Sequence, residues 1–290
     1  MTRTVVTGAS GLLGGAVLRE LGGEGWSHTV AALPDGTPLR RVELRDGGLE
    51  EALREARPGL VVHCAALTDV DACEADPEAA RALNSEAPGR LAATAAALGA
   101  GFVHISTDAV YDGDRDGLHA EDEAPRPMNA YARTKRDGER AVLEAHPQAL
   151  VVRTTMHGWS GPGRPSFSEA ILGALREGRR LTLFRDVVFS PLNVADLAAL
   201  LHRLAESGAS GVLNVGASDA VSKEAFGRLV ARTFELPEDP IEPIDVADLG
   251  LRAPRPRNQA LAVERLTQLL GAPPPSVADG LRRMREEEPT

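Results

Sequence analysis

The sequence predicts an α/β protein with a doubly wound parallel sheet of the Rossmann type and a smaller C-terminal lobe. Three observations point to this class. Short apolar segments alternate with helical segments over residues 1–155, a glycine-rich turn follows the first apolar segment, and the alternation stops after Thr154. Short apolar runs of this kind are typical of strands that helices cover on both faces.

The elements of the first half follow in order along the chain. The expected strands are Thr4-Val5-Val6, 28–33, 41–44, 60–64, 101–106 and 149–154. The expected helices are a stretch that follows the turn 7–14 and runs to about Leu21, then 49–56, 77–98 and 129–144. The residue before a proline is disfavoured in a helix, so the second helix ends before Pro58. The polar stretch 112–127, which is rich in Pro and Gly, predicts a loop.

The second half has a less regular pattern. A loop is expected over 156–166, short strands near 181–184 and 211–214, and helices near 167–177, 194–206, 222–235, 263–270 and 276–286. We predict a Rossmann domain over residues 1–155 and mainly a substrate-binding lobe over residues 156–290, with parts near 181–217 returning to the core. A cleft between the two is the expected place for a ligand.

Composition and charge exclude several classes of partner. The 290 residues include 42 acidic and 32 basic side chains, which gives a net charge of −10. This charge argues against nucleic acid or an anionic membrane surface, because both attract basic faces. No apolar run reaches the ~18 residues of a membrane span. We expect no signal peptide, because the first residues are predicted to enter a strand directly. Two cysteines, Cys64 and Cys73, are too few for a disulfide framework, so we expect a cytoplasmic protein.

The glycine-rich turn carries the first functional signal. Gly8, Gly11 and Gly14 have the spacing G-x-x-G-x-x-G between the first strand and the first helix, with Ser10, Leu12 and Leu13 between them. Gly8 permits the tight turn, Gly11 lets backbone approach a pyrophosphate, and Gly14 lets the helix pack on the strand. The free N–H groups and the dipole of the helix N-terminus then favour the phosphates. The turn predicts a dinucleotide site.

The choice of nicotinamide cofactor depends on the end of the second strand. A carboxylate there would bind the ribose 2′-hydroxyl of NADH and repel the 2′-phosphate of NADPH. The expected strand 28–33 ends in Leu33-Pro34, Asp35 comes slightly late, and Arg40 and Arg41 could reach a phosphate. We therefore favour NADPH and keep NADH as the alternative.

Tyr131 and Lys135 carry the second signal. Of the 32 basic residues, 30 are Arg and 2 are Lys, and the chain has only two Tyr, yet one Tyr and one Lys stand four residues apart on a predicted helix. A nearby ammonium lowers the pKa of a phenol, which can then exchange a proton with a carbonyl or an alcohol near neutral pH. A lysine ammonium can also bind a ribose, for which Arg is no equivalent. The other lysine, Lys223, follows Ser222 at an expected helix start and gains nothing evident from being Lys.

Thr107 lies at the carboxyl end of a predicted strand, after Ser106, where ligands of open α/β sheets bind. Taken alone, this pair is more typical of a local turn cap. Together with Tyr131 and Lys135, it favours a hydroxyl that hydrogen-bonds the reacting oxygen.

These residues together resemble the extended short-chain dehydrogenase/reductase family, most closely the dTDP-4-dehydrorhamnose reductases, over nearly the whole chain. Further matching stretches are 63–71, Asn84, 103–108, 127–131 and 255–261. The resemblance implies reduction of a keto group on a nucleotide-linked 4-keto-6-deoxy sugar by NADPH or NADH.

The resemblance also implies roles for individual residues. It makes Thr107, Tyr131 and Lys135 the catalytic triad. It places the cofactor along the glycine turn and at Glu43, Leu44, Cys64, Ala65, Ala66, Ser106, Tyr131 and Lys135. It places the substrate at Thr68, Asp108, Ala109, Met156, His157, Ser190, Arg255 and Arg257.

Some positions depart from the family pattern. Ala16 stands where reductases with Mg²⁺ at a dimer contact carry a carboxylate, so we predict no metal and either a monomer or a homodimer. Ala109 and Met156 replace a Tyr and a Trp that shape the sugar pocket, and His157 and Trp159 are candidates to refill it; a solvated loop histidine is the other interpretation of His157. The substrate therefore stays open, and a specialised natural-product ketone is an alternative.

Other features have plainer interpretations. Asp69, Asp71, Glu74 and Asp76 are expected to form a solvated helix start and not a metal site. Cys64 is expected to be a small buried side chain and not a nucleophile. Arg252, Arg255 and Arg257 fit either a diphosphate site or a solvated surface.

Two further functions remain open. A sugar-nucleotide epimerase or dehydratase would use the same cofactor without net consumption. A non-catalytic NADP-binding regulatory subunit, as known for methionine adenosyltransferase, would need a partner enzyme; the intact Thr107, Tyr131 and Lys135 argue against it.

Overall fold

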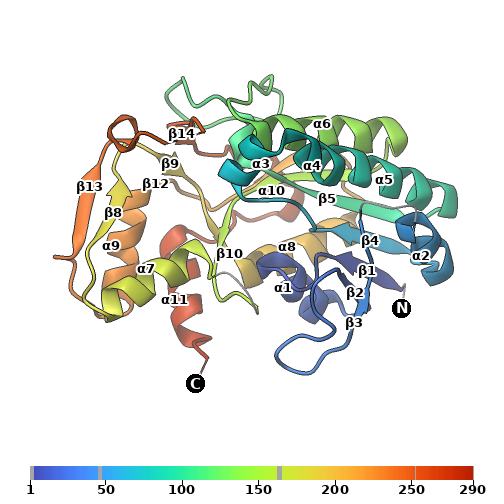
Figure 1. The fold of residues 1–290 in the computed structure, drawn as a ribbon, viewed down its shortest axis with the longest axis horizontal. Coiled ribbons are helices and arrows are strands. Elements are labelled where there is room, and N and C mark those ends of the chain that lie inside the picture. The colour runs from blue at the N-terminus through green and yellow to red at the C-terminus, as the bar shows by residue number, and fades with distance from the viewer. Residues whose placement is uncertain (1–2, 45–47, 162–164, 252, 290) are drawn as a thin grey trace.

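The computed structural model describes residues 3–44, 48–161, 165–251 and 253–289. Its centre is a seven-stranded sheet in which every neighbouring pair is parallel, in the order β11-β6-β5-β4-β1-β2-β3 (Figure 1). The strands are β1 (Thr4–Thr7), β2 (Glu24–Ser27), β3 (Leu39–Arg41), β4 (Leu60–His63), β5 (Gly101–Thr107), β6 (Leu150–Thr154) and β11 (Gly211–Val215). The predicted α/β class with a Rossmann-type parallel sheet is confirmed.

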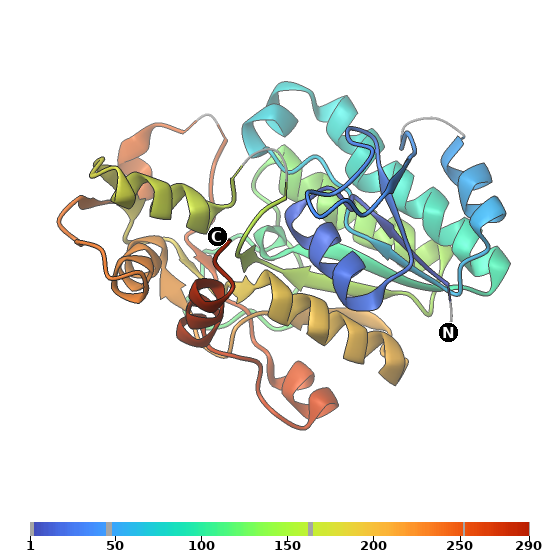
Figure 2. The same cartoon turned by 90° about the horizontal axis from the view of Figure 1, so that it is seen from below.

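Eleven α-helices lie in the described part of the chain. They are α1 (Leu12–Leu21), α2 (Gly48–Ala56), α3 (Val70–Ala75), α4 (Pro77–Arg81), α5 (Ala87–Leu98), α6 (Ala130–Ala145), α7 (Phe167–Arg176), α8 (Val194–Ser207), α9 (Lys223–Thr233), α10 (Glu264–Leu270) and α11 (Val277–Glu286). Helices α2, α5 and α6 cover one face of the sheet, and α1 and α8 pack side by side on the other (Figures 1 and 2). No helix in these described ranges is long and apolar enough to cross a membrane.

The core has one layer on each face of the sheet, as the strand period requires. Val5 and Val6 are both fully buried but belong to different clusters, Val5 with Trp26 and Leu53, and Val6 with Leu13. Burying an aliphatic side chain of this size contributes about 1.5–3 kcal/mol. Because β1 buries such side chains on both of its faces, it is stable only in the centre of the sheet, where both faces are covered. The chain reverses its strand order at β1, which lies between β4 and β2. Ligands of open α/β sheets bind at the carboxyl ends of such strands.

The predicted helix 77–98 is present as one helical path with a local change of pitch. Between α4 and α5 lies a π-helical segment, η1 (Ala82–Glu86). The segment brings the chain close to α6, where a Cβ on Gly138 would lie 2.1 Å from the Asn84 carbonyl oxygen. Only a glycine permits this approach, and it places the Asn84 side chain beside the pocket described below.

The second half contributes small sheets and returns once to the main sheet. The small sheets comprise β7 (Met156–His157) with β10 (Leu192–Asn193), β8 (Leu181–Phe184) with β13 (Ile241–Ile244), and β9 (Val188–Phe189) with β12 (Val221–Ser222) and β14 (Asn258–Gln259). Strand β11 adds to the edge of the seven-stranded sheet and α8 packs on α1, whereas β8 and β13 lie with α7 and α9 in the smaller lobe (Figure 1). A domain boundary at 155/156 stays a prediction.

The prediction of the second strand was wrong. Residues 28–33 form a loop, and β2 is the preceding segment Glu24–Ser27. Helix α1 ends in Gly22 and Gly23, whose φ values of +67° and +103° turn the chain back at once. A Cβ on Gly25 would lie 2.5 Å from the Leu18 and Leu39 side chains, so the helix packs directly on this strand. Strand β3 starts earlier than predicted for the same reason, at Leu39 instead of 41.

Candidate active site

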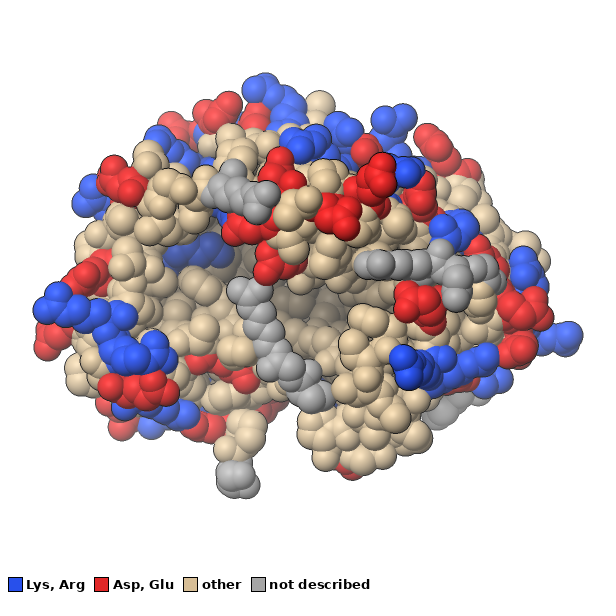
Figure 3. All heavy atoms as spheres, viewed as in Figure 1, with Lys and Arg blue, Asp and Glu red and all other residues tan. Residues whose placement is uncertain are grey.

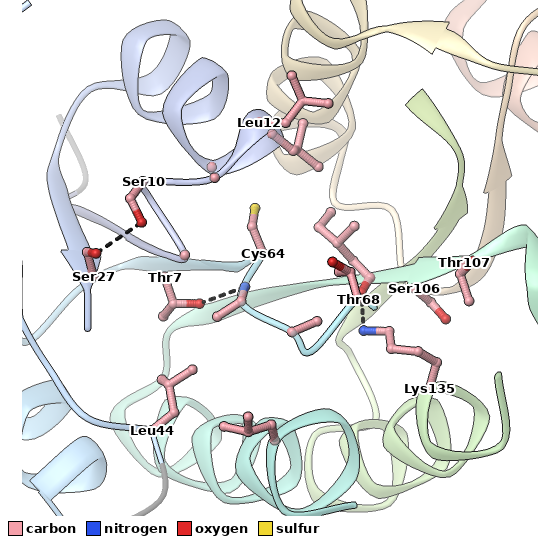
Figure 4. Close-up of a pocket in the computed structure, with 18 of the residues that line it drawn as sticks. Thr7, Ser10, Leu12, Ser27, Leu44, Cys64, Thr68, Ser106, Thr107 and Lys135 are labelled. Carbon is pink, nitrogen blue, oxygen red and sulfur yellow. Dashed lines mark hydrogen bonds between the residues drawn. The ribbon is translucent and has the colours of Figure 1, made fainter. Parts of the chain in front are cut away.

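A pocket of about 760 Å³ opens at the carboxyl edge of β1, β2, β4 and β5. The same face is hollowed between the sheet domain and the smaller lobe (Figure 3). The pocket brings together the following residues that the sequence singled out: Gly8, Ser10, Gly11, Leu12, Leu13, Gly14, Glu43, Leu44, Cys64, Ala65, Ala66, Thr68, Ser106, Thr107, Asp108, Tyr131, Lys135 and Met156. The close-up in Figure 4 shows how they converge from separate strands and helices.

The glycine turn is built for close backbone packing. Gly8 has φ +67°, in the left-handed region that favours glycine. A Cβ on Gly14 would lie 2.1 Å from the Gly8 carbonyl oxygen, so only glycine allows α1 to start against β1. Gly11 at the N-cap has no side chain to cap the helix, so its first N–H groups face the pocket. This cradle fits a dinucleotide diphosphate.

The end of β2 differs from the expected one. It consists of Ser27, followed by His28, and both residues line the pocket. The Ser27 hydroxyl donates to the Ser10 hydroxyl at 3.0 Å and accepts from the Thr29 backbone N–H at 3.2 Å (Figure 4). The tip of this strand therefore carries hydroxyls and an imidazole and no carboxylate.

The residues considered earlier for cofactor selection lie outside this pocket. Arg40 pairs with Glu55 at 2.6 Å and with Glu24 at 3.7 Å, and its guanidinium lies over the Trp26 ring. Asp35 lines a separate hollow, which it shares with Ala16 and Trp159. Because the second strand ends at Ser27, neither Asp35 nor Arg40 occupies the position that the sequence suggested.

Hydrogen bonds from two side chains, Thr7 and Asn84, hold the loop after β4 in place. Thr7 Oγ1 lies 2.7 Å from His63 Nδ1 and accepts from the Ala65 N–H at 3.5 Å. Asn84 accepts from the Leu67 N–H at 2.8 Å and donates to the Leu67 carbonyl at 3.0 Å. The loop thus presents Ala65 and Ala66 to the pocket with a defined backbone.

Cys64 is half-buried, not fully buried as predicted, and it lines the pocket. Burial raises the pKa of its thiol to about 12, so the thiol is protonated at neutral pH.

Thr107 forms the local cap that its sequence pattern suggested, and its hydroxyl also lies beside Tyr131. Its Oγ1 accepts from the Ala109 N–H at 3.1 Å and so caps a short 3₁₀ helix, η2 (Asp108–Val110). The same hydroxyl donates to Asp108 Oδ1 at 3.1 Å and lies within hydrogen-bonding reach of the Tyr131 phenol. The local cap holds the hydroxyl in place beside the tyrosine.

Tyr131 and Lys135 lie in the first turns of α6, whose N-cap Asn129 accepts from the Ala132 N–H at 2.9 Å. Glu74 also accepts from the Ala130 N–H at 2.7 Å. Two separate contacts therefore hold the start of this helix. They direct Tyr131 and Lys135 into the pocket.

The protonation of the tyrosine differs from the expectation. Burial raises the pKa of Tyr131 to about 12, and the contact with Thr107 lowers it by less. Lys135, only 2 % exposed, donates from Nζ to the Ile105 carbonyl oxygen at 2.7 Å. Burial lowers the pKa of Lys135 to about 8. The ammonium is thus turned toward the sheet, and the predicted lowering of the phenol pKa by Lys135 is not found in this geometry.

A buried polar network that was not predicted from the sequence lies behind Thr107 and Lys135. Ser106 donates to Glu139 at 2.5 Å, and Arg153 binds both oxygens of that carboxylate, with Nη2 at 2.7 Å from Oε2. Arg153 also donates to the Tyr111 hydroxyl at 2.8 Å. Glu139 stands eight residues after Tyr131 on α6, on the same side as Lys135, so helical spacing was the one available signal.

His104 lies under Lys135, with its Nε2 3.5 Å from the ammonium. Its ring stacks on His63 with centroids 5.5 Å apart. Burial and Lys135 hold the pKa of His104 well below the usual value, so the ring is neutral and Nε2 can accept. Neither histidine was singled out from the sequence.

Several predicted substrate residues lie outside the pocket. His157 is 1 % exposed and packs edge-on against Phe226, so it is neither a solvated loop histidine nor a wall of the pocket. Trp159 donates to the Met284 carbonyl at 2.7 Å on the side of the separate hollow and does not refill the sugar space. Ser190 is buried, and its hydroxyl accepts a hydrogen bond from the Leu261 N–H at 3.4 Å. Ala109 is also buried, and neither residue lines the pocket.

The arginines near the end of the chain line a hollow of about 630 Å³ with Met128 and Asp186. Arg255 contacts Asp71 at 3.3 Å, and Arg257 contacts Asp186 at 3.5 Å. Arg252 lies outside the described residues.

The remaining predictions can be placed briefly. Asp69 caps α3 and Asp76 caps α4, so the acidic run is the predicted helix start. Pocket residues without a prior prediction are Thr7, Trp26, Ser27, His28, Val42, Leu83, Ile105, Thr154 and Thr155.

Comparison with known proteins shows the family of the chain. The model of the RmlD substrate binding domain covers residues 2–289. The chain belongs to this family. It is 36% identical over 285 residues to a probable low-salt glycan biosynthesis reductase, Agl14, of Haloferax volcanii, with 95% of each chain covered. It is 34% identical over 270 residues to the dTDP-4-dehydrorhamnose reductase of Mycolicibacterium smegmatis, covering 92% of this chain and 80% of the relative.

Solved structures agree. The dTDP-4-dehydrorhamnose reductase of Bacillus anthracis, in complex with NADP, superposes with a TM-score of 0.87 at 26% identity and 99% coverage of both chains. These relatives confirm the predicted family and the prediction of an NAD(P)H-dependent oxidoreductase of the dTDP-4-dehydrorhamnose reductase type. The chain is also 33% identical to methionine adenosyltransferase 2 subunit beta of Pongo abelii, over 92% of this chain and 82% of the relative.

Proposed function

We propose that this protein reduces the keto group of a nucleotide-linked 4-keto-6-deoxy sugar, with Thr107, Tyr131 and Lys135 as the catalytic residues. One observation carries the proposal: the hydroxyl, the phenol and the ammonium line the same pocket as the glycine cradle. A second supports it. The phenol is partly buried, so a carbonyl that meets it leaves bulk water behind.

The cradle would hold the cofactor diphosphate at Gly8, Gly11 and Gly14, and Glu43 and Leu44 would border the adenine. When bound, the reduced nicotinamide supplies the hydride. The residues of the chain bind and orient the cofactor and the substrate, and they supply the proton. Tyr131 donates its proton to the carbonyl oxygen of the substrate. The Thr107 hydroxyl, whose one proton points to Asp108 in this structure, would rotate to donate a second hydrogen bond to that oxygen.

The protonation states fit the direction of reduction. With a pKa raised to about 12, Tyr131 carries its proton throughout the physiological range and is ready to donate it. Lys135 would bind the ribose hydroxyls of the cofactor with its remaining N–H donors. Asp108, Thr68 and Met156 line the same pocket as Thr107 and would contact the sugar.

The nucleotide part of the substrate would occupy the neighbouring hollow. Arg255 and Arg257 line it, and each guanidinium now contacts a single carboxylate at 3.3 and 3.5 Å. A diphosphate offers stronger bidentate acceptors than these partly exposed carboxylates. We propose that both guanidinium groups bind the substrate diphosphate.

We further propose a preference for NADPH over NADH. The Ser10 and Ser27 hydroxyls lie 3.0 Å apart at the tip of β2, beside His28. Such donors suit a 2′-phosphate, whereas the carboxylate that would repel it is not there. The two free cysteines fit a reducing cytoplasm, and with Ala16 at the position discussed above we propose a monomer or homodimer without Mg²⁺.

The test is NADPH oxidation with dTDP-4-dehydrorhamnose by the wild type and by Tyr131→Phe. The wild type is expected to consume NADPH stoichiometrically with alcohol formation. The variant should lose at least about 10²-fold in kcat, the scale of general acid catalysis, while cofactor binding by fluorescence stays nearly intact. Unchanged turnover in the variant would refute the assignment.

The same assay separates the alternatives. An epimerase or dehydratase would convert a nucleotide sugar without net NADPH consumption. A regulatory subunit would show no turnover with any sugar in a panel and would change the activity of a partner enzyme. If the protein reduced a natural-product ketone and none of the nucleotide sugars, ketone reduction would stand but the substrate class would be different.

A further inference from the structure

Lys223 lies in an unusual place for a lysine at a helix start. Its neighbour Ser222 caps α9 by accepting from the Ala225 N–H at 3.0 Å, as the sequence suggested. The side chain of Lys223, however, does not extend into solvent. Its ammonium lies 3.2 Å from the centroid of the Phe189 ring and 4.9 Å from that of Phe167.

Two aromatic faces stabilise a cation but leave its hydrogen-bonding capacity unused. A cation over a ring gains about 0.5–2 kcal/mol, and an ammonium retains three N–H donors. No carboxylate of the described residues lies within 4 Å of this ammonium. Elsewhere the chain uses Arg for 30 of its 32 basic residues. An ammonium is a compact point charge with three rotatable donors, which a flat guanidinium fork does not reproduce.

The small sheet connects this lysine to the active site. Phe189 on β9 is the register partner of Gln259 on β14, so their side chains share one face of that sheet. The Gln259 amide donates to Asp108 Oδ1 at 3.4 Å. Asp108 in turn accepts from Thr107, at the reacting end of the pocket. The ammonium and the Asp108 carboxylate therefore face each other from the two lobes.

Charge supports this placement. Among charged groups, Lys223 has the largest effect on Asp108, and Asp108 is the charged group that acts on Lys223. Burial lowers the pKa of Lys223 to about 8 and raises the pKa of Asp108 to about 6, so both groups are mainly charged at pH 7. The two ions are close enough to interact but too far apart for a direct ion pair. A group that accepts from one and donates to the other would satisfy both.

We propose that Lys223 and Asp108 together bind the sugar hydroxyl next to the reacting carbonyl, on C3, and that Lys223 thereby selects substrates that carry it. A hydroxyl accepts from the ammonium and donates to the carboxylate at the same time. Binding at this point fixes the neighbouring carbonyl beside Thr107 and Tyr131. The proposal rests on the proposed function, because it assumes a keto sugar in the pocket.

The experiment compares two substrates and three variants. The substrates are a dTDP-linked 4-keto-6-deoxyhexose with its C3 hydroxyl and the 3-deoxy analogue. The variants are Lys223→Met, Lys223→Gln and, as a matched control, Arg232→Met. Arg232 is an exposed cation on the same helix that pairs with Glu238 at 2.6 Å, and its charged neighbours are Glu238 and Arg228 instead of Asp108. NADPH binding and the thermal midpoint report whether each variant is folded.

The expected result is a loss that depends on the hydroxyl. For the hydroxylated substrate, Lys223→Met should lower kcat/KM about 10- to 100-fold, as for a lost hydrogen bond to a charged group. For the 3-deoxy substrate, the wild type should already be weaker and Lys223→Met should cost no more than about threefold. Arg232→Met should change neither value. If Lys223→Met does not fold, Lys223→Gln replaces it in the same comparison.

Two results would overturn the proposal. One is an equal loss on both substrates, which would indicate a structural role of the ammonium. The other is an unchanged kcat/KM on the hydroxylated substrate. If the wild type reduces neither sugar, the proposed function itself fails, and this outcome is distinguishable from both.

Discussion

The Lys135 ammonium donates a hydrogen bond to the Ile105 carbonyl oxygen at 2.7 Å, beneath the pocket rather than toward the Tyr131 phenol. The ammonium is almost completely buried, and burial lowers its pKa to about 8. Lys135 is therefore charged below pH 8 and increasingly neutral above it. Tyr131, with its pKa raised to about 12, remains protonated over the same range.

The first prediction follows from this difference. We expect kcat/KM for reduction to fall as pH rises through about 8, because the charge on Lys135 is lost there while Tyr131 keeps its proton. The pH profile of NADPH oxidation measures it. Lys135→Arg should have a lower absolute rate but no fall near pH 8, since a guanidinium stays charged. A fall that persists at the same pH in that variant would assign it to another group.

The second prediction concerns Gly14. Alanine at this position would place a Cβ 2.1 Å from the Gly8 carbonyl oxygen, between two backbones that cannot both move. We expect Gly14→Ala to destabilise the protein by about 1–3 kcal/mol, the range for overpacking, and to weaken NADPH binding at least tenfold. Thermal unfolding and a fluorescence titration measure the two effects.

Gly173 is the matched control for Gly14. It also lies inside a helix, but a Cβ there would meet nothing within 4 Å. Gly173→Ala should therefore stabilise the protein by about 0.5–1 kcal/mol through helix propensity, with unchanged cofactor binding. Equal behaviour of the two variants would contradict the packing argument.

The third prediction tests cofactor selection at Ser27. A carboxylate at the tip of β2 would accept from the ribose 2′-hydroxyl of NADH and repel the 2′-phosphate of NADPH. We expect Ser27→Asp to lower the ratio of kcat/KM values, NADPH over NADH, at least tenfold. Asp35→Asn, in the loop that the sequence suggested, should leave this ratio unchanged because Asp35 does not line the pocket. An unaltered ratio in Ser27→Asp would locate the selection elsewhere.

The fourth prediction concerns the buried pair of Arg153 and Glu139, each with a side chain only 4% exposed. Arg153→Met would leave the Glu139 carboxylate buried without its partner. A loss of about 3–5 kcal/mol is typical of such a change. Urea unfolding measures it.

The double variant Arg153→Met/Glu139→Gln should recover part of that stability, because it removes the uncompensated charge. Arg180→Met, in a largely exposed pair with Glu242, should change the unfolding midpoint little. A double variant as unstable as Arg153→Met would indicate that packing of the guanidinium, and not its charge, stabilises this region.

Local signals in the sequence were sufficient for most of the fold. The glycine spacing, the apolar runs and the prolines act over a few neighbouring residues, and nearly all of the predicted helices and strands are present. The second strand was predicted at the wrong residues because Val30 and its apolar neighbours form a stronger local pattern than Glu24–Ser27. What selects the shorter segment is the packing of Gly25 against Leu18 and Leu39, which no local pattern contains.

The sequence by itself determined that Tyr131 and Lys135 lie on one face of a helix, because residues four apart share a face wherever that helix packs. Only the tertiary structure decided their electrostatic state, since burial raises the pKa of Tyr131 and lowers that of Lys135. It also decided the place of Lys223, which lies far from Asp108 in the chain and faces it only after β9 and β14 pair. Burial, and with it the pKa of a side chain, depends on which segments distant in the sequence pack together and exclude water, and only the tertiary structure shows that packing.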